Sequence, residues 1–136
     1  MAWSMHGQRT GWGQIYLATY KDADGNWLDG GNSYTLRVPP DPPVEAFWSI
    51  TLYDVDTRCL LRNPRETVDR SSRMDLISDD DGGVTIDIGP EPRPGREQNW
   101  IPTVAGKAWF PYFRLYSPTE RFLDTTWVLP DIEREG

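Results

Sequence analysis

The fold is decided by residues 46–54, AFWSITLYD, in which apolar side chains recur at every second position. Successive side chains of a β-strand point to opposite faces, so Trp48, Ile50 and Leu52 fall together on one face. The other face carries two aromatic rings and two hydroxyls: Phe47, Ser49, Thr51 and Tyr53. We expect the first face to lie in the core and the second to meet another sheet, a partner or solvent.

Short alternating segments recur along the rest of the chain, separated by turns rich in the 12 glycines and 12 prolines. Further strands are predicted at residues 14–20, 33–38, 84–88 and 108–116, with a last short strand in the tail. Pro111 indicates an edge strand or a bulge, because proline cannot donate to a ladder. Short helical turns are predicted at 63–69 and 118–122. The pattern predicts an all-β fold, an antiparallel β-sandwich of jelly-roll character. The predicted core comprises Trp48, Ile50, Leu52, Val84, Ile86, Ile88, Phe113 and Leu115.

A chain of 136 residues fits one domain with a real core. We expect a loose N-terminal segment at 1–13 and a single sandwich domain at 14–136. The start of the chain lacks an apolar run behind a positive region, and no stretch is long and apolar enough to span a membrane. The sequence therefore predicts no signal peptide or transmembrane segment, and it does not indicate where in the cell the protein acts.

Charge and composition narrow the range of partners and cofactors. The net charge is −7 with only two lysines, which argues against nucleic acid and against an anionic membrane surface. Cys59 is the single cysteine and His6 the single histidine, so neither an internal disulfide nor a Cys–His catalytic pair is expected. We expect no cofactor.

The loop at 21–31, KDADGNWLDGG, is the strongest metal candidate in the chain. Its first, third and fifth ligand positions match a calcium loop of the EF type: Asp22, Asp24 and Asn26. Trp27 stands where that loop needs glycine, and Ser33 stands where it needs a bidentate glutamate. We therefore expect no metal, but a tight hairpin turn in which Gly25 takes a positive φ, aspartates close Asx turns and Trp27 packs back.

Aromatic residues exceed what a core of this size needs, with seven Trp, six Tyr and four Phe. Exposed rings on a sheet face stack on sugars or form a protein interface. The alternation of the strand at 108–116 places Arg114 opposite the expected core. The candidate ligand or partner surface comprises Trp27, Tyr53, Trp100, Tyr112, Arg114 and Tyr116.

Several segments, taken in order, carry a family resemblance. They are YKDADGNWLDG, PPDPPVEAFWSITLYD, DDDGGVTIDI, QNWIP, FRLYSP and LDTTWVLPDIE. In these segments the chain resembles the bacterial domain of unknown function 1214 over about residues 14–134. The resemblance implies a β-sandwich, and it implies that relatives carry this domain behind another uncharacterised one, domain of unknown function 1254. It implies no catalytic residues.

Two functions remain open at this point. The first is an interaction or accessory module without catalytic machinery of its own, which binds a protein partner or a second copy of itself. The second is a carbohydrate-active or other carboxylate-dependent hydrolase, with or without a metal, for which Asp54, Asp56, Asp87 and Asp124 are the strand-associated carboxylates. A carbohydrate is therefore a further ligand class to consider.

Overall fold

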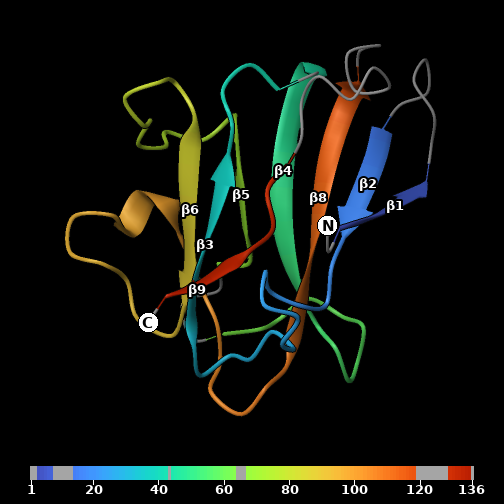
Figure 1. Ribbon diagram of the computed structural model, residues 1–136, viewed down its shortest axis with the longest axis vertical. Coiled ribbons are helices and arrows are strands. Elements are labelled where there is room, and N and C mark those ends of the chain that lie inside the picture. Colours follow the sequence, from blue (N-terminus) through green and yellow to red (C-terminus); the bar gives the residue numbers. More distant parts are fainter. Residues whose placement is uncertain (1–2, 8–13, 43, 64–66, 119–128, 136) are drawn as a thin grey trace.

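The computed structural model describes residues 3–7, 14–42, 44–63, 67–118 and 129–135. Within them, nine strands form two sheets that pack face to face (Figure 1). The five-stranded sheet has the order β1 (Ser4–Gly7), β2 (Gln14–Ala18), β8 (Trp109–Pro118), β4 (Val44–Asp54) and β5 (Asp69–Ser71). The four-stranded sheet has the order β7 (Trp100–Pro102), β6 (Val84–Gly89), β3 (Ser33–Val38) and β9 (Glu133–Glu135).

The predicted all-β sandwich is confirmed. Neighbouring strands are antiparallel, with the exception of β6 and β7, which run parallel. Among the described residues the one helical element is a 3-10 turn, η1 (Glu97–Asn99). It follows a segment whose sequence is charged and rich in proline. Of the two predicted helical turns, 64–66 and 119–122 lie outside the described residues, and β5 begins at Asp69 where the first of these turns was expected to end.

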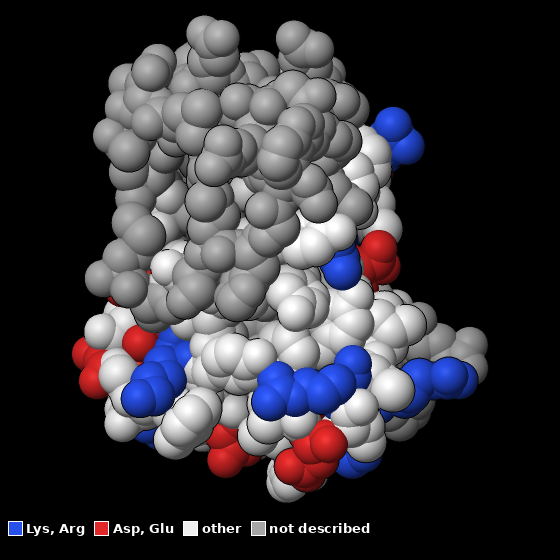
Figure 2. Space-filling view, turned by 90° about the vertical axis from the view of Figure 1, so that its right-hand side faces the viewer, with Lys and Arg blue, Asp and Glu red and all other residues white. Residues whose placement is uncertain are grey.

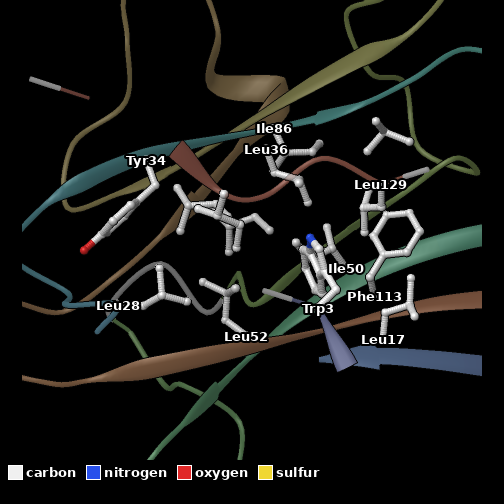
Figure 3. Close-up of a cluster of buried hydrophobic side chains, with 14 of the residues drawn as sticks. Trp3, Leu17, Leu28, Tyr34, Leu36, Ile50, Leu52, Ile86, Phe113 and Leu129 are labelled. Atoms are coloured by element: carbon white, nitrogen blue, oxygen red, sulfur yellow. The ribbon is translucent and has the colours of Figure 1, made fainter. Parts of the chain in front are cut away.

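The core lies where the alternation of the two long strands places it. In the ladder between β4 and β8, Trp48 pairs with Leu115 and Ile50 with Phe113, and all four side chains are buried. From the opposite sheet, Tyr34, Leu36 and Ile86 point toward them, and Leu28, Trp3 and Leu129 fill the space between the sheets (Figure 3). Seven of the eight predicted core residues are buried, and Val84 is partly buried against the cluster.

The position of Pro111 differs from its prediction, because β8 lies at the centre of its sheet, between β2 and β4. Pro111 pairs with Leu52, whose own N–H and C=O bond to Val68 and Leu61 on the far side of β4. The backbone of Pro111 therefore points toward β2. The last pair in the ladder between β2 and β8 is Ala18 with Tyr112, so this ladder stops one residue short of Pro111. The register shift in β4 falls instead between Val44 and Phe47.

The described part of the N-terminal segment contributes to the sandwich. Ser4–Gly7 forms β1 and pairs with β2, although residues 1–13 were expected to be loose. The Trp3 side chain is buried, and its indole Nε1 donates to the carbonyl oxygen of Pro130 at 2.8 Å. This bond ties the beginning of the chain to the segment that leads into β9.

Candidate functional site

The outer face of the five-stranded sheet gathers aromatic side chains from three strands. Register places Tyr116 beside Phe47, Tyr112 beside Thr51, and Phe110 beside Tyr53 on β8 and β4. On the other side of β8, Tyr16 lies opposite Arg114. These positions have the same parity as Phe47 and the opposite parity to the core residues, so their side chains point away from the other sheet. We name this surface the aromatic face; its rings are Tyr16, Tyr20, Phe47, Tyr53, Phe110, Tyr112 and Tyr116.

The rings of the aromatic face pack on one another. Five of them form a connected series, with centroid distances of 4.9 Å for Tyr20–Phe110, 5.5 Å for Phe110–Tyr53, 5.2 Å for Tyr53–Tyr112 and 6.0 Å for Tyr112–Tyr16. Phe47 and Tyr116 stack separately at 4.2 Å. Phe110 is buried by its neighbours, whereas the other six rings remain partly accessible. Such contacts order the rings before any ligand arrives.

Arg114 occupies the middle of the aromatic face. Its guanidinium lies 5.4 Å from the ring of Tyr16, 5.2 Å from Tyr112 and 5.8 Å from Tyr53. Nη2 donates to the hydroxyl of Tyr53 at 2.9 Å, and Nη1 donates to Thr51 Oγ1 at 3.4 Å. A half-buried cation is thus oriented by rings and hydroxyls instead of by a carboxylate.

Two further arginines lie over the ends of the aromatic face. The Arg58 guanidinium lies 5.4 Å from the rings of both Tyr20 and Phe110, and its Nη1 donates to the Tyr20 hydroxyl at 2.7 Å. At the other end, Arg73 lies 3.8 Å above the ring of Phe47. None of Arg58, Arg73 and Arg114 forms an ion pair with a carboxylate in the described part of the chain.

The outer face of the four-stranded sheet has the opposite character. There Arg37 pairs with Asp79 and Asp81 in the turn before β6. Further ion pairs join Arg93 to Glu135 at 3.0 Å and Arg96 to Asp87 at 2.9 Å. Arg37, Arg93 and Arg96 are therefore all paired with carboxylates of the same chain.

The surface seen from the side of β1 and β2 carries both basic and acidic side chains among uncharged ones. In Figure 2 the described part of this side is largely white, with basic side chains spread across it and acidic side chains at its left and right edges and its lower rim.

The structure brings together four of the six predicted surface residues: Tyr53, Tyr112, Arg114 and Tyr116. It adds residues that sequence reasoning missed. Tyr16 could have been found, since it alternates with the buried Ile15 and Leu17. Arg58 and Arg73 lie in turns, where no periodicity shows which way a side chain points.

Trp27 lies beyond one end of the aromatic face, and its predicted packing back onto the loop is wrong. The side chain is 64% exposed, because its neighbour Leu28 takes the inward position of the alternation. Lys21 Nζ lies 4.9 Å from the indole ring. Together with Thr19 and Tyr20, these two residues line a shallow hollow of about 220 Å³.

Trp100 lies apart from the aromatic face, on β7 in the other sheet. It is buried, and its Nε1 donates to the Gly89 carbonyl at 2.9 Å. The adjacent cavity of about 500 Å³ is also lined by Arg70, whose guanidinium donates to the carbonyls of Trp100 and Glu97. Burial lowers the pKa of Arg70, and the negative charge of Asp69 partly offsets this by raising it. This arginine ties β5 to the four-stranded sheet and forms a structural wall of the cavity.

The loop at 21–31 forms the turn that its sequence predicts. Asp22 Oδ1 accepts hydrogen bonds from the N–H groups of Asp24 at 2.9 Å and Asn26 at 3.0 Å, and Gly25 has φ 85°. Lys21 and Trp27 form an antiparallel bridge that closes the hairpin. The described residues contain no group of three or more His, Cys, Asp and Glu side chains that could hold a metal ion.

Of the four carboxylates considered for a hydrolase, Asp54 and Asp87 lie in different sheets and each has a partner, whereas Asp56 is exposed two residues after Asp54. Asp54 ends β4, where its Oδ1 accepts from the N–H of Asp56 at 2.8 Å and its Oδ2 lies 3.5 Å from Lys107 Nζ. Asp87 lies on β6 in the other sheet, paired with Arg96. Asp124 lies outside the described residues.

Comparisons with known proteins agree with this fold. The family model described as "Protein of unknown function (DUF1214)" matches residues 13–120. The chain belongs to this family. A solved structure similar to this chain is that of the VPA0106 protein of Vibrio parahaemolyticus, which is 25% identical, with a TM-score of 0.79 over 91% of this chain and 31% of that one. A putative uncharacterized protein from Burkholderia cenocepacia is 17% identical and shares the fold, with a TM-score of 0.60 over 90% of this chain and 29% of that one.

This DUF1214 chain spans about a third of the length of the two solved proteins. No curated protein is significantly similar to it. Across the described residues, no helix has the length and apolar character needed to cross a membrane.

Proposed function

We propose that this DUF1214 domain is an accessory module without catalytic machinery of its own, and that it binds another protein through the aromatic face. The observation that carries the proposal is the group of six partly accessible, ordered rings around Arg114 on the outer side of a rigid sheet. Aromatic and arginine side chains are enriched at protein interfaces, where they supply most of the binding free energy.

The packing of the aromatic face supports binding over a purely structural role. Monomeric proteins rarely leave a large contiguous apolar surface uncovered unless it serves an interaction. Here the opposite sheet covers the other side of β4 and β8, so the rings contribute little to the core between the sheets. A partner that covers them gains apolar burial without reordering the side chains.

A heterologous partner suits this surface better than a second copy. In a two-fold contact the same patch meets itself, so the unpaired cations of one chain would meet those of the other. Like charges facing each other in an interface are repulsive. We therefore propose that the isolated chain is a monomer at micromolar concentration.

The companion domain that the family resemblance implies, domain of unknown function 1254, is the first partner to test. In the VPA0106 protein about two thirds of the polypeptide lies outside the matched part, which leaves room for a further domain there. A carbohydrate is the alternative ligand for an aromatic surface. The hydrolase hypothesis is less well supported, since Asp54 and Asp87 lie in different sheets and are paired with Lys107 and Arg96.

Site-specific photocrosslinking in the native host tests the proposal. A benzophenone amino acid replaces Tyr116 on the aromatic face or, as the control, Thr35 on the outer face of the four-stranded sheet. We expect one protein, identified by mass spectrometry, to crosslink to position 116 and not to position 35. Equal crosslinking from both positions, or none from position 116, would refute the proposal.

A further inference from the structure

We infer that the segment docking on the aromatic face is acidic, with aspartate or glutamate side chains that pair with Arg58, Arg73 and Arg114. This inference rests on the proposed function and names the chemistry of the partner. The three arginines lie at one end, the other end and the middle of the face. Each is held against at least one ring, so the cations are positioned before a ligand binds.

Arg114 shows the specific need for a carboxylate. A guanidinium has five N–H donors, and in the described structure Arg114 uses two groups, one toward Thr51 and one toward Tyr53. Both acceptors are neutral hydroxyls, and among the described residues Arg114 forms no ion pair with a carboxylate. Charge-assisted bonds to a carboxylate are about twice as strong as neutral ones, and guanidinium matches a carboxylate in bidentate geometry.

Arg58 adds an independent observation, because its backbone has φ 61°. This left-handed conformation is occupied mainly by Gly, Asn and Asp, and an arginine there is strained. The turn would form more readily with asparagine, yet the residue present is one whose side chain reaches Tyr20 and Phe110. Strained residues of this kind cluster at binding sites, where the side chain outweighs the backbone cost.

The distribution of charge points in the same direction. The arginines of the opposite face, Arg37, Arg93 and Arg96, are paired with carboxylates of the same chain. In a chain of net charge −7, three of the six described arginines that lack an ion pair, Arg58, Arg73 and Arg114, lie on the aromatic face. An acidic segment would be repelled by most of the molecule and attracted to this face, which sets its orientation. Asp69, opposite Thr51 on the edge strand, is a carboxylate of this face and limits the attraction there.

The spacing of the face fits an extended segment. Phe47 and Tyr53 are six residues apart on β4, a span of about 20 Å at a rise of roughly 3.4 Å per residue. An extended segment of about seven residues covers that length. Carboxylates spaced along it would meet the arginines, and apolar side chains between them would meet the rings.

Binding of defined polymers, measured by fluorescence anisotropy, tests the inference on the purified chain. The probe is a labelled random copolymer of glutamate and tyrosine. Polygalacturonate supplies carboxylates on a sugar, and oligothymidylate supplies phosphates with rings. The variants are Arg58→Asn, which keeps a residue suited to the left-handed turn, and Arg114→Gln, with Arg93→Gln on the opposite sheet as the matched control.

We expect the copolymer to bind, and each aromatic-face variant to weaken its binding about fivefold, equivalent to about 1 kcal/mol. Arg93→Gln should change it less than about twofold, and added salt should weaken it. Circular dichroism confirms that each variant is folded.

The inference is overturned if the copolymer does not bind, if Arg93→Gln weakens binding as much as Arg114→Gln, or if polygalacturonate or oligothymidylate binds the face more tightly. Each of these results leaves the crosslinking at position 116 to decide the proposed function separately. A crosslinked partner whose docking segment is not acidic would likewise refute the inference alone.

Discussion

Arg114 on β8 donates a hydrogen bond from Nη2 to the hydroxyl of Tyr53 on β4, 2.9 Å away. In the ladder Arg114 pairs with Ser49, so the two side chains reach toward each other along the outer surface of the sheet, with the guanidinium beside the ring of Tyr112. This contact lies directly behind the core residues Ile50 and Phe113, on the opposite side of the same two strands. One pair of strands thus supplies both the core and the candidate binding surface.

Substitution by aspartate should lower the stability of the fold by very different amounts on the two sides of β4. Ile50→Asp buries an unpaired charge and should destabilise the fold by several kcal/mol, enough to unfold a domain of this size. Tyr53→Asp replaces a partly accessible side chain and should cost about 1–3 kcal/mol, leaving a folded protein. Urea unfolding followed by circular dichroism measures both. If Tyr53→Asp also unfolds the chain, the aromatic face belongs to the core.

Adjacent glycines in the loop before β3 should differ sharply. A Cβ on Gly30 would overlap the backbone oxygen of Val104 and lie 2.8 Å from that of Lys107, whereas a Cβ on Gly31 meets nothing nearer than 3.6 Å. Gly30→Ala should therefore destabilise the fold by about 2 kcal/mol or more, and Gly31→Ala by less than about 1 kcal/mol. Equal melting temperatures for the two variants would show that this loop is not packed as described.

The acidic loop at 21–31 should contribute to stability without calcium. Asp22→Ala removes the acceptor of two backbone N–H groups and should cost about 1–2 kcal/mol. Asp24→Ala should change stability by less than about 0.5 kcal/mol, because the described structure gives this side chain no bond. Both effects should be the same in calcium and in chelator. A calcium-induced rise in melting temperature that Asp24→Ala abolishes would identify a metal site instead.

Acid should weaken the turn before β6 through Asp81. The backbone N–H of Gly83 and the guanidinium of Arg37 hold the pKa of this carboxyl below its usual range. A folded-state pKa below the unfolded value of about 4 means that the contribution is complete above that pH and is lost as pH falls through the folded pKa.

Unfolding by urea below about pH 4 tests this pH dependence. Between neutral pH and acid, Asp81→Asn should lose less stability than the unmodified chain. Asp80→Asn is the control, because Asp80 makes no hydrogen bond or ion pair in the described structure. Identical acid responses of the two variants would contradict the role of Asp81.

The two-residue period predicted the sandwich and most of its core. It worked for β4 and β8 because each of these long strands has one fully buried face, as with Ile50 and Phe113. The two-residue period failed at Trp27, which lies outside the predicted strands. Its side chain points to solvent because Leu28 fills the inward position. Pro111 likewise lies in a central strand because the pairing with β2 ends before it.

The candidate site could be predicted only in part, because its assembly depends on long-range pairing. The alternation placed Tyr53 and Arg114 on outward faces, but only the order β2, β8, β4 brings Tyr16, Arg114 and Ser49 into one row. The positions of Arg58 and Arg73 over the rings follow from turn geometry that no sequence period encodes.

The central claim is that another protein covers the aromatic face, and sedimentation velocity of the chain with the partner identified by crosslinking tests it most directly. We predict that the chain alone is a monomer, that it forms a complex with that partner, and that Tyr112→Glu abolishes the complex while Thr35→Glu on the opposite face preserves it. A dimer of the chain alone, or a complex that survives Tyr112→Glu in a folded variant, would contradict the account.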